Sequence, residues 1–398
     1  MVTGSELRAA AERIAEEVVE TRRDIHRHPE LAYEEQRTAA LVAERLRALG
    51  LDDVRTGVGK TGVVGVLRGA ASGSKTVLLR ADMDALPIQE ASGVPFESTV
   101  PGVMHACGHD AHTAILLGTA KLLSERRAQL PGSVVFMFQP AEENGGAGAK
   151  RMIEDGVLDD PKVDAAFALH GAGRRPVGQA AISPGPSHGS SDRFIITVRG
   201  KGGHASAPQS TVDPVVVAAH IVTALQTLVS REVPPAEQAV VTVGSITAGT
   251  IFNVIPETAT LKGTFRAHSE LVRTHLRTRI EEVAKGVASA LRATAELEEF
   301  GIGYPPVVSD AAMAELAAAA AREVLGEAGV VPGQAEMGGE DFSFVLQKVP
   351  GAFIRLGTRD PSWESPKPAH APTFQLSEDA LPLGVALMAT TAIRFLES

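Results

Sequence analysis

The spacing of helix and strand signals limits the fold of this chain more than any other feature. In the first half, short apolar runs bounded by glycine alternate with segments whose apolar residues recur every three to four positions. Residues 62–67 and 133–138 are typical of strands, and residues 5–23 and 112–125 are typical of helices. This alternation predicts an α/β sheet that is at least partly parallel and covered by helices on both faces.

The pattern changes at about residue 190. The next predicted elements follow the order β-α-β-β-α-β and cover residues 193–198, 213–230, 239–246, 258–265, 269–292 and 295–300. This is the ferredoxin-like order, in which one sheet carries both helices on the same face. We therefore predict a discontinuous α/β domain with a mixed sheet over residues 1–188 and 304–398, and an inserted ferredoxin-like α+β domain over residues 189–303.

Composition excludes several classes of protein. The chain has 398 residues, of which 44% are hydrophobic and 22% charged, which is typical of a soluble globular protein. Its 38 basic and 48 acidic residues give a net charge of −10, so neither nucleic acid nor an anionic membrane is expected as a partner. The single cysteine, Cys107, excludes an intramolecular disulfide and favours a reducing compartment, and we expect a cytoplasmic protein.

Polar side chains that can bind metal follow three apolar runs that are typical of strands. They are Asp82 and Asp84 after residues 77–79, Glu142 and Glu143 after residues 134–138, and His170 after residues 167–169. In open α/β sheets the ligand crevice lies beyond the carboxyl ends of the strands, so we expect these groups to converge.

A further group surrounds the cysteine. Cys107 and His109 are two residues apart and do not share a helical face, so they could bind one centre only from a loop or extended segment, which Gly108 favours. His370, in the proline-rich loop 366–372, is another candidate ligand. Thiolate, imidazole and carboxylate donors together suit zinc or a similar divalent ion.

The adjacent carboxylates Glu142 and Glu143 suggest a division of roles. On an extended segment, neighbouring side chains point in opposite directions, so one could bind metal while the other faces substrate. A carboxylate beside a metal-bound water would serve as a general base. This pairing predicts hydrolysis rather than redox chemistry.

Other interpretations of these residues stay open at this point. Cys107 could be an inert buried side chain or a covalent nucleophile with a histidine base. Asp82 and Asp84 could cap a helix or turn. His26 and His28 resemble a ligand pair, but we interpret them as structural, because they end a helix where cations favour the helix dipole.

Several motifs, taken together, resemble one known family. They lie at residues 79–87, 104–112, 139–143 with 148–149, 200–206, 253–257 and 338–342. The family is the group of metal-dependent amidohydrolases that contains hippurate hydrolases, N-acyl-amino-acid deacylases and indole-acetyl-amino-acid conjugate hydrolases, related to aminoacylases and zinc carboxypeptidases. The similarity runs in order from about His26 to the C-terminus.

The resemblance implies two divalent metal ions per subunit, Zn²⁺ or Mn²⁺, with Co²⁺ or Ni²⁺ also compatible. The ligands that it implies are Cys107, shared between the ions, and His109, Glu143, His170 and His370. It gives Glu142 the role of general acid/base towards a water that bridges the ions. Asp82 occupies the position of a histidine ligand in related carboxypeptidases, and Asp84 that of a supporting aspartate.

The inserted domain resembles the lid and dimerisation domain of this family. His204 would stabilise the oxyanion, in some relatives from across the dimer, and Asn253 and Arg266 would hold the substrate near its carboxylate. Arg266 could instead be a solvated charge at a strand end. Residues 171–175 and 187–190 depart from the family pattern, and the second segment contains His188, to which no role is assigned.

The resemblance therefore implies an amidohydrolase that cleaves N-acyl-L-amino acids, such as N-acetyl or N-benzoyl derivatives, and that forms a homodimer through the inserted domain. A small-peptide carboxypeptidase or dipeptidase of the same superfamily is the first alternative. A hydrolase that depends on Cys107 and a metal-stabilised binding protein without turnover are the others.

Overall fold

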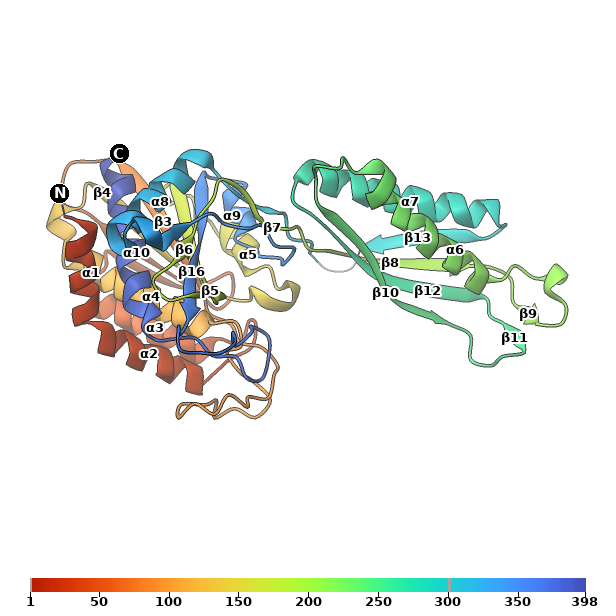
Figure 1. Cartoon of the computed structure of the whole chain (residues 1–398), viewed down its shortest axis with the longest axis horizontal. Coiled ribbons are helices and arrows are strands. Elements are labelled where there is room, and N and C mark those ends of the chain that lie inside the picture. The colour runs from red at the N-terminus through yellow and green to blue at the C-terminus, as the bar shows by residue number, and fades with distance from the viewer. Residues whose placement is uncertain (1, 300–301) are drawn as a thin grey trace. The chain divides into compact units, whose positions relative to one another are not determined.

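The computed structural model describes residues 2–299 and 302–398. The chain divides into two compact units, each with its own hydrophobic core. The first unit comprises residues 1–187, 308–334 and 341–398, and the second comprises residues 188–307 and 335–340. The short segment 335–340 thus belongs to the second unit, although the residues on either side of it, 308–334 and 341–398, belong to the first. Figure 1 shows the elements of both units.

The first unit is built on an eight-stranded mixed sheet, which confirms the predicted α/β class. Its strands, in spatial order, are β1 (Asp53–Val58), β2 (Gly62–Arg68), β4 (Gly132–Gln139), β3 (Lys75–Asp82), β5 (Ala165–Pro176), β16 (Gly351–Arg359), β6 (Ala180–Ala181) and β15 (Val330–Val331). Strands β4, β3, β5 and β16 run parallel to their neighbours in this order, so their carboxyl ends meet at one edge.

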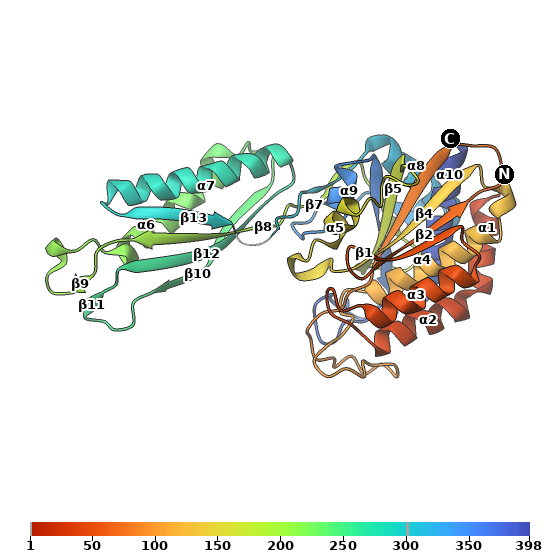
Figure 2. The same cartoon turned by 180° about the vertical axis from the view of Figure 1, so that it is seen from behind.

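Helices flank this sheet. They are α1 (Gly4–Arg13), α2 (Ala15–Arg27), α3 (Gln36–Ala48), α4 (His109–Ser124), α5 (Gly148–Glu154), α8 (Ala311–Leu325), α9 (Ser343–Leu346) and α10 (Ala380–Glu397). Helices α4 and α10 are apolar on nearly all sides, and they pack against each other and against β3 as core helices. Figure 2 shows α1 to α4 beside the sheet.

Two predicted helix boundaries were wrong. The single helix expected over residues 5–23 is two helices, because the backbone of Ile14 leaves helical geometry between α1 and α2. The helix expected from residue 112 begins at His109, because Gly108, which has a left-handed backbone (φ 94°), is its N-cap.

The second unit has the predicted ferredoxin-like topology. Its antiparallel sheet has the order β10 (Ala239–Ala248), β12 (Thr258–Ala267), β8 (Asp192–Arg199) and β13 (Thr294–Glu299), and its helices are α6 (Pro214–Thr227), continued by a π-turn (Leu228–Glu232), and α7 (Glu270–Ala290). The last residue predicted for the final strand, 300, lies outside the described residues. Strands β9 (Gly203–His204) and β11 (Val254–Ile255) form a separate ribbon.

Two further short strands, β7 (Gly185–His188) and β14 (Val307–Ser309), occur where the chain passes between the units. Among the described residues, two helical segments are long and apolar enough to cross a membrane by length and composition, Pro214–Glu232 and Ala380–Glu397. In the second segment, 83% of the apolar window is buried, as expected of a core helix. The first packs one face, including Val217 and Ile221, into the core of the second unit.

Phe194 tests the core of the second unit. It is 1% exposed, and we expect Phe194→Ala to lower the free energy of unfolding of this unit by about 3–5 kcal/mol, because truncation leaves a cavity. Urea denaturation followed by far-UV circular dichroism measures the change. Phe252, which is 94% exposed, provides the matched control, and an equal loss in Phe252→Ala would contradict this account of the core.

Candidate active site and metal centre

The predicted convergence at the carboxyl edge of the sheet occurs in the structure. Three groups of metal-capable side chains in the first unit, taken from the described residues, place one donor atom per residue within 4.8 Å of one another. They are Cys107 with Glu143 and His370, His109 with Glu142 and Glu143, and Asp82 with His109, His112 and His170. The structure thus brings together the five predicted ligands and the predicted base.

Gly108 determines how Cys107 and His109 are presented. Its left-handed backbone forms the N-cap of α4, so that Cys107 lies before the helix while His109 is the first helical residue. A β-carbon at this position would strain the backbone, since φ is 94°. The Cys107 sulfur lies 3.5 Å from Nε2 of His170, which connects this segment to β5.

His109 is oriented through its other ring nitrogen. Its Nδ1 lies 2.9 Å from the Asp84 carbonyl oxygen and 3.2 Å from the Asp84 carboxylate, which are both acceptors. Nδ1 therefore carries the proton. Nε2 is buried, makes no hydrogen bond among the described residues, and lies 3.5 Å from an Asp82 carboxylate oxygen. This is the arrangement expected of a histidine that offers Nε2 to a metal ion.

Asp84 also fixes the two adjacent glutamates. Its carboxylate oxygens accept the backbone N–H groups of Glu142 at 3.1 Å and Glu143 at 3.0 Å. The expectation of an extended backbone at this pair is wrong: Glu142 is helical (φ −70°, ψ −42°) and a 3₁₀ turn begins at Glu143. Both carboxylates nevertheless reach the surroundings of His109.

His370 approaches from the loop that follows β16. Its Nε2 lies 3.0 Å from a Glu143 carboxylate oxygen, and its backbone N–H donates to the carbonyl oxygen of Ala106. Its backbone has φ 62°, which is strained for a residue other than glycine. The hydrogen bond with Glu143 raises the pKa of His370 above its usual value, although burial opposes this change.

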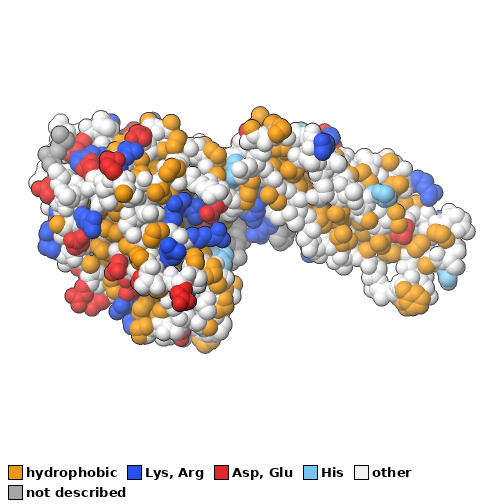
Figure 3. All heavy atoms as spheres, in the orientation of Figure 1, with side chains coloured by type: hydrophobic (Ala, Val, Ile, Leu, Met, Phe, Trp, Pro, Cys, Tyr) orange, Lys and Arg blue, Asp and Glu red, His pale blue; other side chains and the backbone are white. Residues whose placement is uncertain are grey.

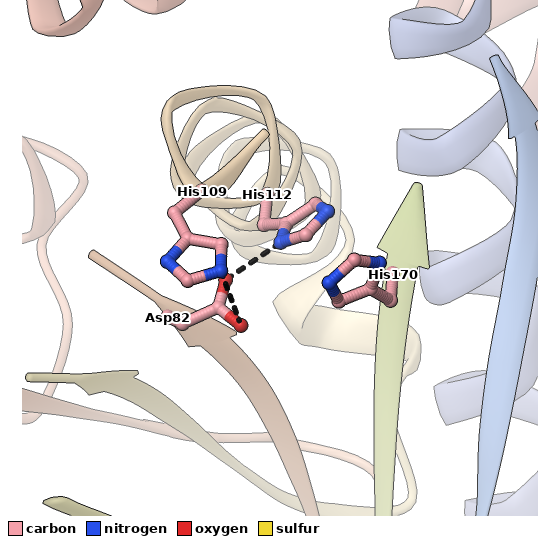
Figure 4. Close-up of side chains that lie close together, drawn as sticks. All are labelled: Asp82, His109, His112 and His170. Carbon is pink, nitrogen blue, oxygen red and sulfur yellow. Dashed lines mark hydrogen bonds and ion pairs between the residues drawn. The ribbon is translucent and has the colours of Figure 1, made fainter. Parts of the chain in front are cut away.

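Beneath these residues lies a buried ionic network that sequence reasoning missed (Figure 4). His112 Nε2 accepts the Gly171 N–H at 2.9 Å, so Nδ1 donates to Asp82 at 2.6 Å, and both ring nitrogens are used. The other Asp82 oxygen pairs with Arg80 at 2.7 Å. His112 and Asp82 are therefore engaged with each other and with protein partners. The i, i+3 spacing of His109 and His112 was the available signal.

Burial changes the acid–base properties of the predicted ligands. It raises the pKa of the Cys107 thiol to about 12, so that the thiol alone is protonated at neutral pH and is a poor nucleophile. Coordination to a divalent ion deprotonates such a thiol. Burial, with His112 and His109 nearby, holds the pKa of His170 well below its usual value and keeps it in the neutral form that binds metal.

A second buried network lies behind α4. The two ring nitrogens of His26 each face a carboxylate, Nδ1 that of Asp110 at 2.8 Å and Nε2 that of Glu90 at 3.0 Å, and Arg22 donates to Asp110 at 2.6 Å. Sequence reasoning placed His26 at a helix end, and it does occupy the last turn of α2. Its main partners are buried carboxylates rather than the helix dipole alone.

The predicted substrate-binding residues all lie on the second unit. His204 pairs with Val254 in the β9–β11 ribbon, and the N–H of Ala205 donates to the carbonyl oxygen of Asn253, so that His204 and Asn253 are close neighbours. Arg266, on β12, is half-buried and donates to the Met337 carbonyl oxygen at 2.8 Å.

A site that contains a buried imidazole nitrogen without a hydrogen bond, a thiol and adjacent carboxylates has the donors that borderline divalent ions use. The fold and this donor set define a class, the hydrolases that use divalent metal ions at the carboxyl edge of an α/β sheet. The particular family follows from comparison. The chain belongs to peptidase family M20/M25/M40, whose model matches residues 78–394.

Curated relatives cover nearly the whole chain. An IAA-amino acid hydrolase of Arabidopsis thaliana is 44% identical over 95% of this chain and 86% of its own length. A thermostable carboxypeptidase of Saccharolobus solfataricus is 42% identical over 95% of each chain. An N-acetylcysteine deacetylase of Bacillus subtilis is 40% identical over 96% of this chain and 97% of its own. The protein is therefore a metallo-amidohydrolase of this family.

Solved structures agree with the fold. A putative aminohydrolase from methicillin-resistant Staphylococcus aureus superposes with a TM-score of 0.92 at 36% identity and covers 99% of this chain and 100% of its own. A dinuclear metal-binding peptidase of Bacillus subtilis has a TM-score of 0.85 at 37% identity and covers 97% of this chain and 99% of its own. Together with the clustered donors, this similarity supports two metal ions in the site.

His26, in the second buried network, gives the stability of the fold a testable pH dependence. Burial lowers the pKa of His26, but Asp110 and Glu90 together raise it by more than burial lowers it, so the pKa in the folded protein lies above the usual 6.5. The charged imidazole therefore stabilises the fold fully below pH 6.5, and this stabilisation is lost as the pH rises through the folded pKa. In protein from which metal has been removed with a chelator, we expect His26→Gln to lower the free energy of unfolding more at about pH 6 than at about pH 9.

Urea denaturation of wild type and variant at both pH values measures this difference. His28→Gln is the neighbouring control, because the His28 side chain is 39% exposed and should show no comparable trend. A destabilisation by His26→Gln that grows towards pH 9 would contradict the charged pair.

Proposed function

We propose that this enzyme hydrolyses N-acyl-L-amino acids, such as N-acetyl or N-benzoyl derivatives, to a carboxylate and a free amino acid. The observation that carries the proposal is the pair Glu142 and Glu143, two adjacent carboxylates whose oxygens both reach the surroundings of His109. The names of two relatives, an IAA-amino acid hydrolase and an N-acetylcysteine deacetylase, support an acyl-amino acid as substrate.

The proposed ligands are Cys107, which would be shared between the ions, with His109, Glu143, His170 and His370. When bound, divalent ions lower the pKa of water and polarise a substrate carbonyl. We assign Zn²⁺ or Mn²⁺ as the ions, and Co²⁺ and Ni²⁺ could use the same donors.

Glu142 acts as general base and then as general acid. Its carboxylate takes a proton from the attacking water, whose oxygen forms a bond with the amide carbon. The same proton then passes to the leaving nitrogen as the carbon–nitrogen bond breaks. Asp84 supports this step, because it holds the backbone N–H groups of Glu142 and Glu143 and the ring of His109.

The remaining roles fall to the second unit. His204 would donate to the oxyanion, and Asn253 and Arg266 would hold the substrate carboxylate. The net charge of −10 does nothing to attract a carboxylate substrate, so local positive groups and donors would have to provide that attraction. Arg266 could instead have a purely structural role, because its hydrogen bond to the Met337 carbonyl oxygen already uses one guanidinium nitrogen.

We further propose a homodimer formed through the second unit. Most of the exposed large hydrophobic side chains lie there, including Val215, Val216, Ile246 and Phe252, and Figure 3 shows hydrophobic side chains across the visible face of this unit. In the part of the chain that the structure describes, strand β10 also lies at the edge of its sheet with no strand on its outer side. A cytoplasmic location is proposed because a thiol ligand needs a reducing compartment.

A carboxypeptidase or dipeptidase activity is the second candidate, since a relative that is 42% identical carries the name carboxypeptidase. Both activities would use the same site and the same base. They differ in whether the group released from the amino acid is a simple acyl group or a peptide. A hydrolase that depends on Cys107 as nucleophile is disfavoured by the raised pKa of its thiol.

Glu142→Gln is the first test. The metal-reconstituted wild type should release free amine from a panel of N-acetyl and N-benzoyl amino acids, and the variant should lose at least about 10²–10⁴-fold in kcat, because glutamine cannot accept the proton. Metal content, measured by inductively coupled plasma mass spectrometry, should stay at the wild-type value. Retained turnover would contradict the assignment of the base, and release from dipeptides alone would favour the second candidate.

Cys107→Ala tests whether Cys107 is a metal ligand, and here the expected change is in metal content. We expect this variant to lose metal, because alanine removes a donor that the two ions would share. Equilibrium dialysis against Mn²⁺ measures the stoichiometry. A variant that keeps the full metal content would show that Cys107 is not a ligand, and activity that survives chelation in the wild type would favour a thiol mechanism.

A further inference from the structure

The loop that carries Glu142 and Glu143 has an unusual backbone. Ala141 adopts the left-handed conformation (φ 51°), and the helical Glu142 follows it. A left-handed residue next to a right-handed one turns successive N–H groups towards one side, where they can bind anionic oxygens. Here three successive N–H groups, from Ala141 to Glu143, each donate to a buried carboxylate.

Two different carboxylates accept these three hydrogen bonds. Asp84 accepts the second and third, as described above. Glu35 accepts the first: its Oε1 lies 2.9 Å from the Ala141 nitrogen, and its Oε2 accepts the Thr61 hydroxyl at 2.5 Å. Glu35 comes from the segment before α3, more than a hundred residues away in the chain.

Glu35 is costly to bury. It is 0% exposed, and among the described residues no lysine, arginine or histidine forms an ion pair with it. An unpaired buried carboxylate is unfavourable unless hydrogen bonds compensate, and burial raises the pKa of Glu35 accordingly. A neutral side chain would be easier to accommodate in the same place, so stability alone does not account for a carboxylate here.

The surrounding packing holds the same loop in place. The Tyr33 hydroxyl, two residues before Glu35, donates to the Gly146 carbonyl oxygen, and the Gly148 N–H donates to the Ala141 carbonyl oxygen. A β-carbon on Gly148 would lie 1.7 Å from the Pro140 carbonyl oxygen, so the loop returns on itself without space for a side chain. Residues 33–35 thus contact both ends of the loop.

We propose that Glu35 is a positioning residue for the hydrolytic reaction. Glu35 accepts the Ala141 N–H and so holds the left-handed turn that orients the side chains of Glu142 and Glu143 for their different roles. Asp84 accepts the next two N–H groups. This inference rests on the roles proposed above for Glu142 as base and Glu143 as ligand. Without the acceptor at Glu35, Ala141 is free to relax to negative φ, which turns both following side chains.

The test compares Glu35→Ala, Glu35→Gln and the neighbouring control Glu34→Ala, whose side chain is exposed. At saturating Mn²⁺, Glu35→Ala should lose about a hundredfold in kcat while KM changes less than about twofold, because the reacting groups are misplaced but the substrate contacts remain. Glu35→Gln keeps an oxygen acceptor for the Ala141 N–H and should stay within about threefold of wild type in kcat. Glu34→Ala should match wild type.

Metal binding gives a readout that does not depend on turnover. Titration with Mn²⁺, with free ion measured by electron paramagnetic resonance, should show weaker binding of at least one ion in Glu35→Ala and wild-type binding in Glu35→Gln. If Glu35→Ala does not fold, as judged by circular dichroism, Thr61→Val replaces it, because this variant removes the other hydrogen bond to Glu35 and should lower kcat in the same direction.

Several results would overturn the proposal. Wild-type kcat and metal affinity in Glu35→Ala would do so, as would a loss in Glu35→Gln equal to that in Glu35→Ala, or unchanged kcat in Thr61→Val. Glu142→Gln, measured alongside, separates this inference from the proposed function. If Glu142→Gln retains turnover, the base assignment fails; if it is inactive while Glu35→Ala is fully active, only the inference about Glu35 fails.

Discussion

The carboxylate of Asp84 joins the parts of the site that come from distant segments of the chain. It stands just beyond the end of β3, is 1% exposed, and accepts hydrogen bonds from the His109 ring and from the backbone of Glu142 and Glu143. One buried charge thereby orients an imidazole from α4 and a turn that follows β4. The parallel order of these strands makes this possible, because it brings their carboxyl ends to one edge.

Further buried charged side chains lie near Asp84. Arg80 pairs with Asp82 and with Asp341, and Asp82 in turn holds His112. Buried ion pairs of this kind contribute little net stability when compared with apolar packing, but the loss of one partner is strongly destabilising. They are better explained as a rigid support for the neighbouring residues that we propose as ligands than as a source of stability.

Much of the architecture could be predicted from the sequence, because it depends on local periodicity. The α/β sheet, the ferredoxin-like unit and the meeting of Asp84, Glu142 and His170 at one edge all follow from the order of strands and helices. The details that could not be predicted depend on long-range contacts or on single backbone angles. The left-handed Ala141, the bond from Glu35 and the pairing of His112 with Gly171 join segments that no local pattern connects.

We propose that divalent ions bind among Cys107, His109, Glu143, His170 and His370 rather than between Asp82 and His112. An X-ray structure of the Mn²⁺-loaded enzyme, with anomalous differences recorded at the manganese edge, locates such ions. We expect two anomalous peaks in contact with those five side chains, with Asp82 and His112 still hydrogen-bonded to each other. A single peak, or a peak coordinated by Asp82 and His112, would contradict it.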